Sequence, residues 1–140
     1  MKQFVTVILF VLITFFMNTI AKEHPKQLQA SRSNNDIKID GELSETVWNG
    51  APISGFIQRE PEEGIPSTEQ TKVWLTYDND AIYVAAKLYD SEPELIDRNL
   101  ARRDSWMDSN WFTFFVDPYL DKKTGYFFAV NPGGSIMDGT

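Results

Sequence analysis

Two apolar, aromatic-rich runs on either side of a polar, turn-rich connection constrain this chain more than any other feature. The runs are Trp111–Asp117 and Tyr126–Asn131, and the connection contains Asp117-Pro118 and Thr124-Gly125. This pattern predicts an antiparallel β-hairpin. Because apolar side chains alternate to both sides of the first run, we expect that strand to be central and buried on both faces.

A second hairpin is predicted over Lys72–Tyr77 and Ala81–Tyr89, where apolar side chains alternate with polar ones. The connection Asp78-Asn79-Asp80 favours a tight turn, because short Asp and Asn side chains bond the local backbone and tolerate positive φ. Ahead of it, Asp36–Gly41 predicts a short strand, and Glu42–Asn49 a short helix. We expect Asp40 to cap that helix and Trp48 to fill the core.

Further along the chain, Ser91 and Glu94 fit a capping box for one helical turn that continues through Leu95, Ile96 and Leu100. Asn131-Pro132-Gly133-Gly134 predicts a turn before a last run, Ser135–Thr140. Several short strands with turn signals between them predict an all-β fold, an antiparallel β-sandwich with one or two short helices. So few strands leave open edges, so we expect residues 36–140 to be an incomplete sandwich, truncated at the C-terminus.

The N-terminus carries an export signal. Lys2, the apolar run Phe4–Phe16 and the small-residue end Thr19-Ile20-Ala21 predict a signal peptide over residues 1–21. The alternative is a membrane anchor, for which the run is short. Residues 22–35 predict an irregular, disordered leader that contains His24, the only histidine. We therefore expect a bacterial protein of the periplasm, the outer membrane or cell surface, or the extracellular space.

Composition excludes several kinds of chemistry. The chain has no cysteine, one histidine and a net charge of −7. Cysteine nucleophiles, disulfides and zinc sites built on His and Cys are therefore excluded, and an acidic surface argues against nucleic acid. There is no glycine-rich phosphate loop. Hydrolysis by two carboxylates stays formally open, but no pair is marked in the sequence, so we expect no catalysis within these 140 residues.

Carbohydrate binding suits the stretch before the first aromatic run. A sugar offers apolar C–H faces ringed by hydroxyls, so its site needs an aromatic plane beside side chains that bond hydroxyls in pairs. One stretch of nine residues supplies that mixture, and its candidate binding residues are Arg102, Arg103, Asp104, Trp106, Asp108 and Asn110. The alternative is that Trp106 packs on the sheet edge and the charges are solvated.

These motifs resemble family 9 carbohydrate-binding modules and their relatives. The resemblance covers about 100 residues in the right order. In chain order, it is carried by Ile39-Asp40-Gly41-Glu42-Leu43, Trp48, Ala51, Val73–Asp78, Ile82–Ala85, Asn110–Asp117, Thr124-Gly125-Tyr126 and Asn131-Pro132-Gly133-Gly134. Arg102-Arg103-Asp104, Trp111-Phe112 and the Asn-Pro-Gly turn look closest to one subgroup. Its members place such a domain at the N-terminus of a longer bacterial surface protein with a predicted C-terminal outer-membrane barrel.

The resemblance implies a sugar-binding β-sandwich, often stabilised by calcium and attached to carbohydrate-degrading enzymes. Trp106 is the nearest match to a tryptophan that forms one wall of the family's aromatic clamp, although it lies one residue further from the strand. The family's sugar-contacting glutamate falls on Thr113. Asp90 and Asp117 are the candidates for a structural calcium ion.

Three functional hypotheses follow. The first is a secreted, non-catalytic module that binds an oligo- or polysaccharide. The second is a structural domain of an outer-membrane protein, which would meet the membrane only through a further C-terminal region. The third is an accessory domain of a glycoside hydrolase whose catalytic part lies beyond Thr140.

Overall fold

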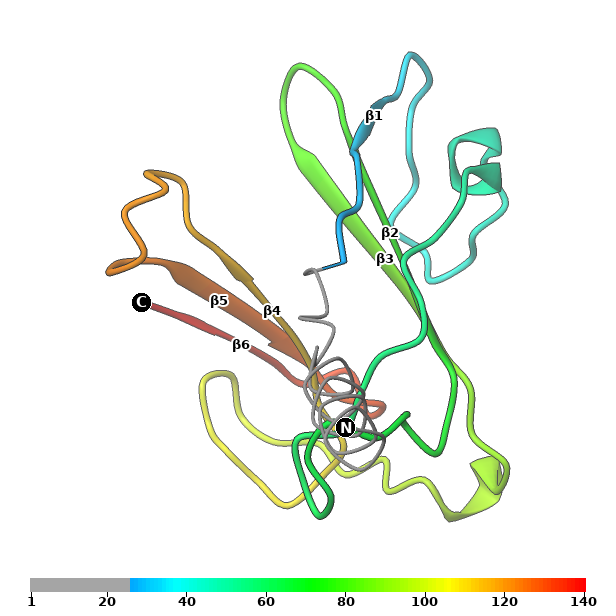
Figure 1. The fold of residues 1–140 in the computed structure, drawn as a ribbon, viewed down its shortest axis with the longest axis vertical. Coiled ribbons are helices and arrows are strands. Elements are labelled where there is room, and N and C mark those ends of the chain that lie inside the picture. Colours follow the sequence, from blue (N-terminus) through cyan, green and yellow to red (C-terminus); the bar gives the residue numbers. More distant parts are fainter. Residues whose placement is uncertain (1–25) are drawn as a thin grey trace, which may run out of the picture. The chain divides into compact units, whose positions relative to one another are not determined.

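The computed structural model describes residues 26–140, and the predicted signal peptide at residues 1–21 lies outside them. Within the described range the chain is all-β, as the sequence predicts, with six strands in two three-stranded sheets (Figure 1). No helix of residues 26–140 has the length and apolarity needed to cross a membrane. The chain divides into two compact units, which are described in turn. Packing of the two sheets as a sandwich stays a prediction.

The first unit comprises residues 26–56 and Thr71–Lys87. Its sheet has the order β1-β2-β3, formed by β1 (Ser31–Arg32), β2 (Thr71–Tyr77) and β3 (Ile82–Leu88). The predicted hairpin is confirmed by β2 and β3. At its turn, the Asp78 N–H donates to the Ala81 carbonyl at 3.0 Å, and Asp78 Oδ1 accepts the Asp80 and Ala81 N–H groups. These bonds hold the pKa of Asp78 below its ordinary value, the Asp80 N–H contributing most.

The predicted irregular leader, residues 22–35, differs from the structure at its end. Ser31–Arg32 forms β1 and pairs in parallel with Thr76 and Tyr77 of β2. The fully buried Thr76 donates its hydroxyl to the Ser31 carbonyl at 2.7 Å, and Ser33 is buried too. Tertiary pairing therefore orders a polar segment that has no apolar periodicity of its own.

The segment between β1 and β2 corrects two predictions. Asp36–Gly41 is not a strand, because the Lys38 N–H donates to Glu45 Oε1 rather than to a neighbouring strand, and Ile39 is 85% exposed. The helix predicted over Glu42–Asn49 is only the 3-10 turn η1 (Thr46–Asn49). Asp40 does not cap it, since its carboxylate instead closes a local turn by accepting the Glu42 N–H.

Trp48, which ends the predicted helix, is buried as predicted. Its indole N–H donates to Glu45 Oε2 at 3.0 Å, so the only polar atom of this buried side chain is paired. The same Glu45 carboxylate accepts backbone N–H groups, its own and that of Lys38, which together with the indole lower its pKa.

The second unit comprises Ile57–Gln70 and Leu88–Thr140. Its sheet has the order β4-β5-β6, with β4 (Phe112–Val116), β5 (Tyr126–Val130) and β6 (Ile136–Gly139), all antiparallel. The predicted hairpin of two aromatic runs is confirmed, with Phe114 opposite Phe128. On one face Ala129 and Met137 are buried.

The position of β4 in this sheet contradicts the sequence-based expectation. β4 lies at the edge and β5 is central among the described strands. Phe115 of β4 is 78% exposed, so β4 is not buried on both faces. The alternation of apolar residues had predicted a fully enclosed strand, but alternation alone reports which residues share a face and not what covers that face.

The predicted capping box of Ser91 and Glu94 is also wrong. The Ser91 hydroxyl donates to Glu69 Oε1 at 2.7 Å and caps no helix. The helical turn that was predicted through Leu100 is only the 3-10 turn η2 (Pro93–Leu95), closed by the Leu95 N–H to the Glu92 carbonyl. A nearby partner for the serine hydroxyl outcompetes the local capping bond.

Candidate functional site

All six predicted sugar-binding residues lie in one irregular segment of the second unit, Arg102–Asn110, which we call the Trp106 loop. It begins with a turn in which the Ser105 N–H donates to the Arg102 carbonyl at 3.2 Å. Asp104, inside this turn, has a φ of 58°. Asp is one of the few residue types that adopt this left-handed conformation at low cost, which explains its place there.

Asp104 fixes the loop to the free edge of β6. Its N–H donates to the Ile136 carbonyl at 3.2 Å, and its Oδ1 accepts the Asp138 N–H at 3.2 Å. Because residues two apart in a strand send their backbone groups to the same side, one aspartate satisfies two groups of the β6 edge. Asp104 therefore takes the place of a further strand.

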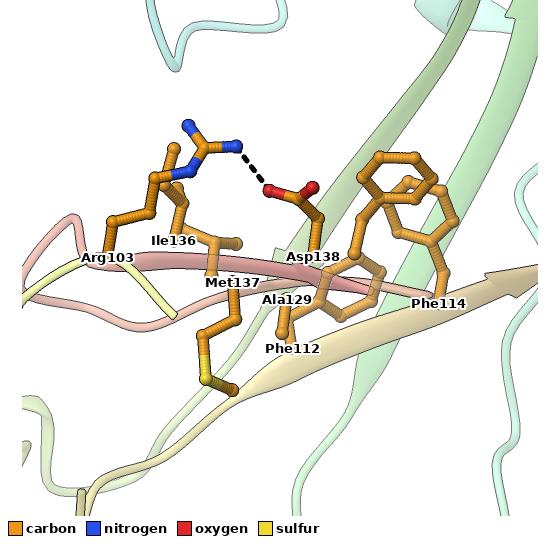
Figure 2. A pocket seen from close by; sticks show the side chains of 9 residues that line it. Arg103, Phe112, Phe114, Ala129, Ile136, Met137 and Asp138 are labelled. Carbon is orange, nitrogen blue, oxygen red and sulfur yellow. Dashed lines mark hydrogen bonds and ion pairs between the residues drawn. The ribbon is translucent and has the colours of Figure 1, made fainter. Parts of the chain in front are cut away.

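An ion pair reinforces this junction. The Arg103 guanidinium pairs with the Asp138 carboxylate (Figure 2). Its Nε also lies 3.5 Å from Asp104 Oδ2. All three side chains are exposed, so the pair positions the loop more than it stabilises the fold. Beside it lies a hollow of about 350 Å³ with an apolar lining, formed by Phe112, Phe114, Phe128, Ala129, Val130, Ile136 and Met137 together with Arg103 and Asp138.

The residues before the loop are fixed to the Asn131–Ser135 turn. The buried Asn131 donates its amide to the Asn99 carbonyl at 2.9 Å and accepts the Ser135 N–H at 2.8 Å. Ser135 is buried as well, and its hydroxyl accepts the Ala101 N–H at 2.7 Å. Gly133 lies close to the backbone of the segment before the loop. A Cβ added at Gly133 would be 2.5 Å from the Asn99 carbonyl oxygen.

Trp106 projects from the loop with 68% of its surface exposed. Its ring packs edge-to-face on Trp111, with ring centroids 5.5 Å apart and an interplanar angle of 71°. Trp111 is itself fixed, because its indole N–H donates to the Met107 carbonyl at 3.2 Å. The loop thus presents a largely exposed indole ring that is in contact with a fixed aromatic neighbour.

The indole N–H groups distinguish Trp106 from the other three tryptophans. Trp48 donates to Glu45, Trp74 to the Gly50 carbonyl and Trp111 to the Met107 carbonyl. The Trp106 N–H has no acceptor among residues 26–140. An exposed indole with an unused donor is equipped to meet a polar ligand with an apolar face.

The other predicted residues divide into two groups. Arg103 and Asp104 are brought together at Asp138, as described above. The side chains of Arg102, Asp108 and Asn110 are exposed and have no hydrogen bond or ion pair within the described range. Asn110 also borders a second apolar hollow, of about 310 Å³, lined by Leu88, Ile96, Asn110, Trp111, Phe112, Val130, Asn131 and Pro132.

Sequence reasoning missed three residues that position the loop. Asp138 holds Arg103, and Asn131 with Ser135 holds the segment before the loop. The Asn-Pro-Gly-Gly signal correctly predicts the turn, and the Gly134 N–H closes it on the Asn131 carbonyl at 3.0 Å. What that signal does not reveal is that the Asn131 side chain reaches across 32 residues to Asn99.

The predicted calcium ligands, Asp90 and Asp117, each close a local turn. Asp117 accepts the Tyr119 N–H at 3.2 Å and the Lys122 N–H at 2.9 Å, one on each oxygen, and Asp90 accepts the Glu92 N–H. The Lys122 N–H is the main reason that the pKa of Asp117 lies below its ordinary value. Residues 26–140 contain no group of three or more His, Cys, Asp and Glu side chains arranged to hold a metal ion. A structural calcium ion, which takes six to eight oxygen ligands, stays a prediction.

Comparison with known protein families, with curated proteins and with solved structures finds no match to this chain. The resemblance to family 9 modules therefore stays a prediction that rests on the quoted motifs. The geometry itself offers an exposed aromatic plane, free hydrogen-bonding side chains on the same loop, and a rigid attachment to the sheet.

Proposed function

We propose that this protein is an exported, non-catalytic carbohydrate-binding module whose Trp106 indole stacks against a sugar ring. The observation that carries the proposal is the presentation of Trp106, whose ring is 68% exposed and in contact with the fixed Trp111 ring, and whose N–H has no acceptor among residues 26–140. A pyranose ring has an apolar C–H face, so contact with the indole removes apolar surface of both partners from water.

The rest of the loop supplies suitable polar partners. Arg102 has up to five N–H donors and Asp108 two acceptor oxygens, and neither side chain is engaged within the described chain. Neighbouring hydroxyls of a sugar each donate and accept, so a cation and a carboxylate on one loop match them. Asp104 bonds β6 near the start of the loop, and the Asn131 amide donates to the Ser109 hydroxyl near its end at 3.4 Å, so little conformational entropy is lost on binding.

Calorimetric titration of glucose, cellobiose and xylo-oligosaccharides tests the proposal. We expect at least one oligosaccharide to bind, and Trp106→Ala to weaken its affinity about tenfold or more, which is ~1.4 kcal/mol. Tyr119→Ala is the matched control, because Tyr119 is 75% exposed in the same unit and is expected to leave affinity unchanged. No binding by the wild type, or an equal loss in both variants, would overturn the assignment of Trp106.

A second function, as a structural or assembly domain of a larger surface protein, is favoured by a different observation. One face of β4-β5-β6 carries half-exposed aromatic residues, among them Phe128 and Tyr126, and such faces commonly mark contacts with other protein. A protein that binds none of the sugars but associates stably with protein would support this alternative. Export is tested by mass spectrometry of the protein secreted by its host, which should begin at Lys22.

A further inference from the structure

The two edge strands of the β4-β5-β6 sheet differ in whether their outward-facing backbone groups have hydrogen-bond partners. On β6, Asp104 bonds the Ile136 carbonyl and the Asp138 N–H, and the Arg103–Asp138 pair adds two charges. On β4, no strand of residues 26–140 pairs with the side that faces away from β5. Among residues 26–140, the β4 edge is therefore unpaired, whereas the β6 edge is blocked by Asp104.

The sequence of β4 lacks the features that protect an open edge. Its five residues, Phe-Thr-Phe-Phe-Val, include no charge and no proline, and its pairing with β5 is continuous from Phe112 to Val116 without a bulge. Natural proteins place a lysine, a proline or a bulge on such a strand to prevent pairing. Phe115, with 78% of its surface exposed, instead offers an aromatic side chain at the edge. An unprotected aromatic edge is suited to pairing with another strand.

We propose that β4 pairs in antiparallel fashion with β4 of a second copy of this chain, about a twofold axis at Phe114. In this register Phe112 lies opposite Val116 of the partner, and Thr113 opposite Phe115 of the partner. All five positions then meet an uncharged partner, and the exposed Phe115 gains a cross-strand neighbour. The strand is its own complement, which is the requirement for a twofold interface.

The charges around β4 permit this approach of two copies. The Trp106 loop before β4 has two arginines and two aspartates, and the following segment Asp117–Thr124 has two aspartates and two lysines. Antiparallel pairing brings the first segment of one copy near the second of the other, and each has a net charge of zero. The chain as a whole has a net charge of −7, so β4 is flanked by a locally neutral surface on an acidic protein.

The blocked β6 edge limits the assembly to two chains. If both edges were open, strand pairing would continue and produce long oligomers. Because Asp104 occupies the β6 edge, the same contact is used once by each copy and closes. The expected product is a discrete dimer.

Sedimentation velocity of the purified protein over a range of concentrations tests the proposal. We expect a reversible monomer–dimer equilibrium, and Phe115→Lys to raise the dissociation constant at least tenfold, because it places a charge in the paired strand. Leu95→Lys makes the same change in charge at a residue that is 71% exposed and lies in η2, outside β4 and the two segments that flank it, and should leave the dimer unchanged. A wild type that stays monomeric, forms open-ended oligomers, or responds equally to both substitutions would overturn the proposal.

Cysteine cross-linking tests the register independently of affinity. The chain has no cysteine, so single introduced cysteines are unambiguous. Residues directly opposite in an antiparallel pair have Cα atoms about 4.5 to 5.5 Å apart, within the range of a disulfide. An equal mixture of Thr113→Cys and Phe115→Cys chains should oxidise rapidly to a cross-linked dimer, and each variant alone much more slowly. Equal rates in all three samples, with circular dichroism confirming that the variants are folded, would exclude this register.

Discussion

Two loops of the second unit each expose one large aromatic side chain and differ in what supports it. The Trp106 loop carries Trp106, 68% exposed, and the segment Asp117–Thr124, which we call the Tyr119 loop, carries Tyr119, 75% exposed. Trp106 packs on Trp111, whereas Tyr119 has no aromatic partner among the described residues. Exposure alone therefore does not distinguish a candidate binding residue, but support by the surrounding structure does.

The two loops are also held in different ways. In the Tyr119 loop the bonds are local, because Asp117 accepts the Tyr119 and Lys122 N–H groups and Asp121 accepts those of Lys123 and Thr124. In the Trp106 loop they come from distant residues, because Asp104 bonds Asp138 of β6, 34 residues away, and Ser109 accepts from the Asn131 amide, 22 residues away. The first loop is a self-contained turn, and the second depends on the tertiary structure. Four substitutions or conditions can test this difference.

The largest effect is expected from Asn131→Ala. It leaves the Asn99 carbonyl and the buried Ser135 N–H without partners, which costs about 2–4 kcal/mol of unfolding free energy. Urea denaturation followed by tryptophan fluorescence measures the loss. Asn79→Ala, which removes an exposed turn amide that accepts from Arg32, should change stability by less than about 0.5 kcal/mol. Equal losses would show that Asn131 is not the anchor of the loop.

Gly133→Ala should disturb the same contact between the Asn131–Ser135 turn and the backbone at Asn99. Its Cβ would be 2.5 Å from the Asn99 carbonyl oxygen and 2.7 Å from that of Arg98, so the backbone before the Trp106 loop must move away. We expect a loss of about 1–3 kcal/mol. Gly64→Ala is a weaker perturbation of packing, since no atom lies within 4 Å of its added Cβ, although its φ of +86° adds backbone strain. A loss of stability no larger than that of Gly64→Ala would show that the close approach of Gly133 to Asn99 does not matter.

Asp104→Ala should have a smaller effect on stability, about 1–2 kcal/mol. It removes one hydrogen bond to the Asp138 N–H and puts a less tolerant residue at a positive φ. Asp104→Asn keeps an acceptor oxygen and tolerates this conformation, so it should recover most of the loss in the same denaturation experiment. If the two variants lose equal stability, the bond to β6 is not the reason for the effect.

The smallest effect is the response of the Tyr119 loop to acid. The pKa of Asp117 is lowered chiefly by the Lys122 N–H, and that of Asp121 chiefly by the Thr124 N–H. A lowered folded-state pKa stabilises the loop above the ordinary aspartate pKa of about 3.9, and this stabilisation is lost as the pH falls through the folded values.

NMR protection factors of the Lys122 and Thr124 amides measure this response. They should fall as the pH is lowered below about 3.9, while the Asn131-anchored Ser135 amide stays protected. Asp121→Asn should remove the pH dependence at Thr124. A simultaneous loss of protection at Ser135 would show that the two loops do not melt independently.

The comparison also shows what the sequence could and could not predict. Turns closed by their own residues were predictable, because Asp78 and Asn131 bond backbone groups within four positions. So was the pairing of the aromatic runs in β4 and β5. Ser91 was not, because its hydroxyl bonds Glu69, 22 residues away, in preference to the local cap.

The site was predictable to a similar extent. Composition located the Trp106 loop and named Trp106, since an aromatic side chain among charged neighbours is visible in the sequence. The residues that position the loop, Asp138 and Asn131, are distant from it in the sequence and are brought to it only by folding. No local sequence pattern therefore indicates their role. The edge position of β4 was equally hidden, because apolar alternation does not reveal the number of neighbouring strands.

The indole N–H signals of ¹⁵N-labelled protein test the central claim most directly, because the four tryptophans report on four environments. On titration with an oligosaccharide that binds, the Trp106 signal should move most and the Trp111 signal next, since the two rings are in contact. The signals of Trp48 and Trp74, which bond Glu45 and the Gly50 carbonyl, should stay in place. If sugar binds and the Trp106 signal does not move, or all four move equally, the proposed role of Trp106 is contradicted.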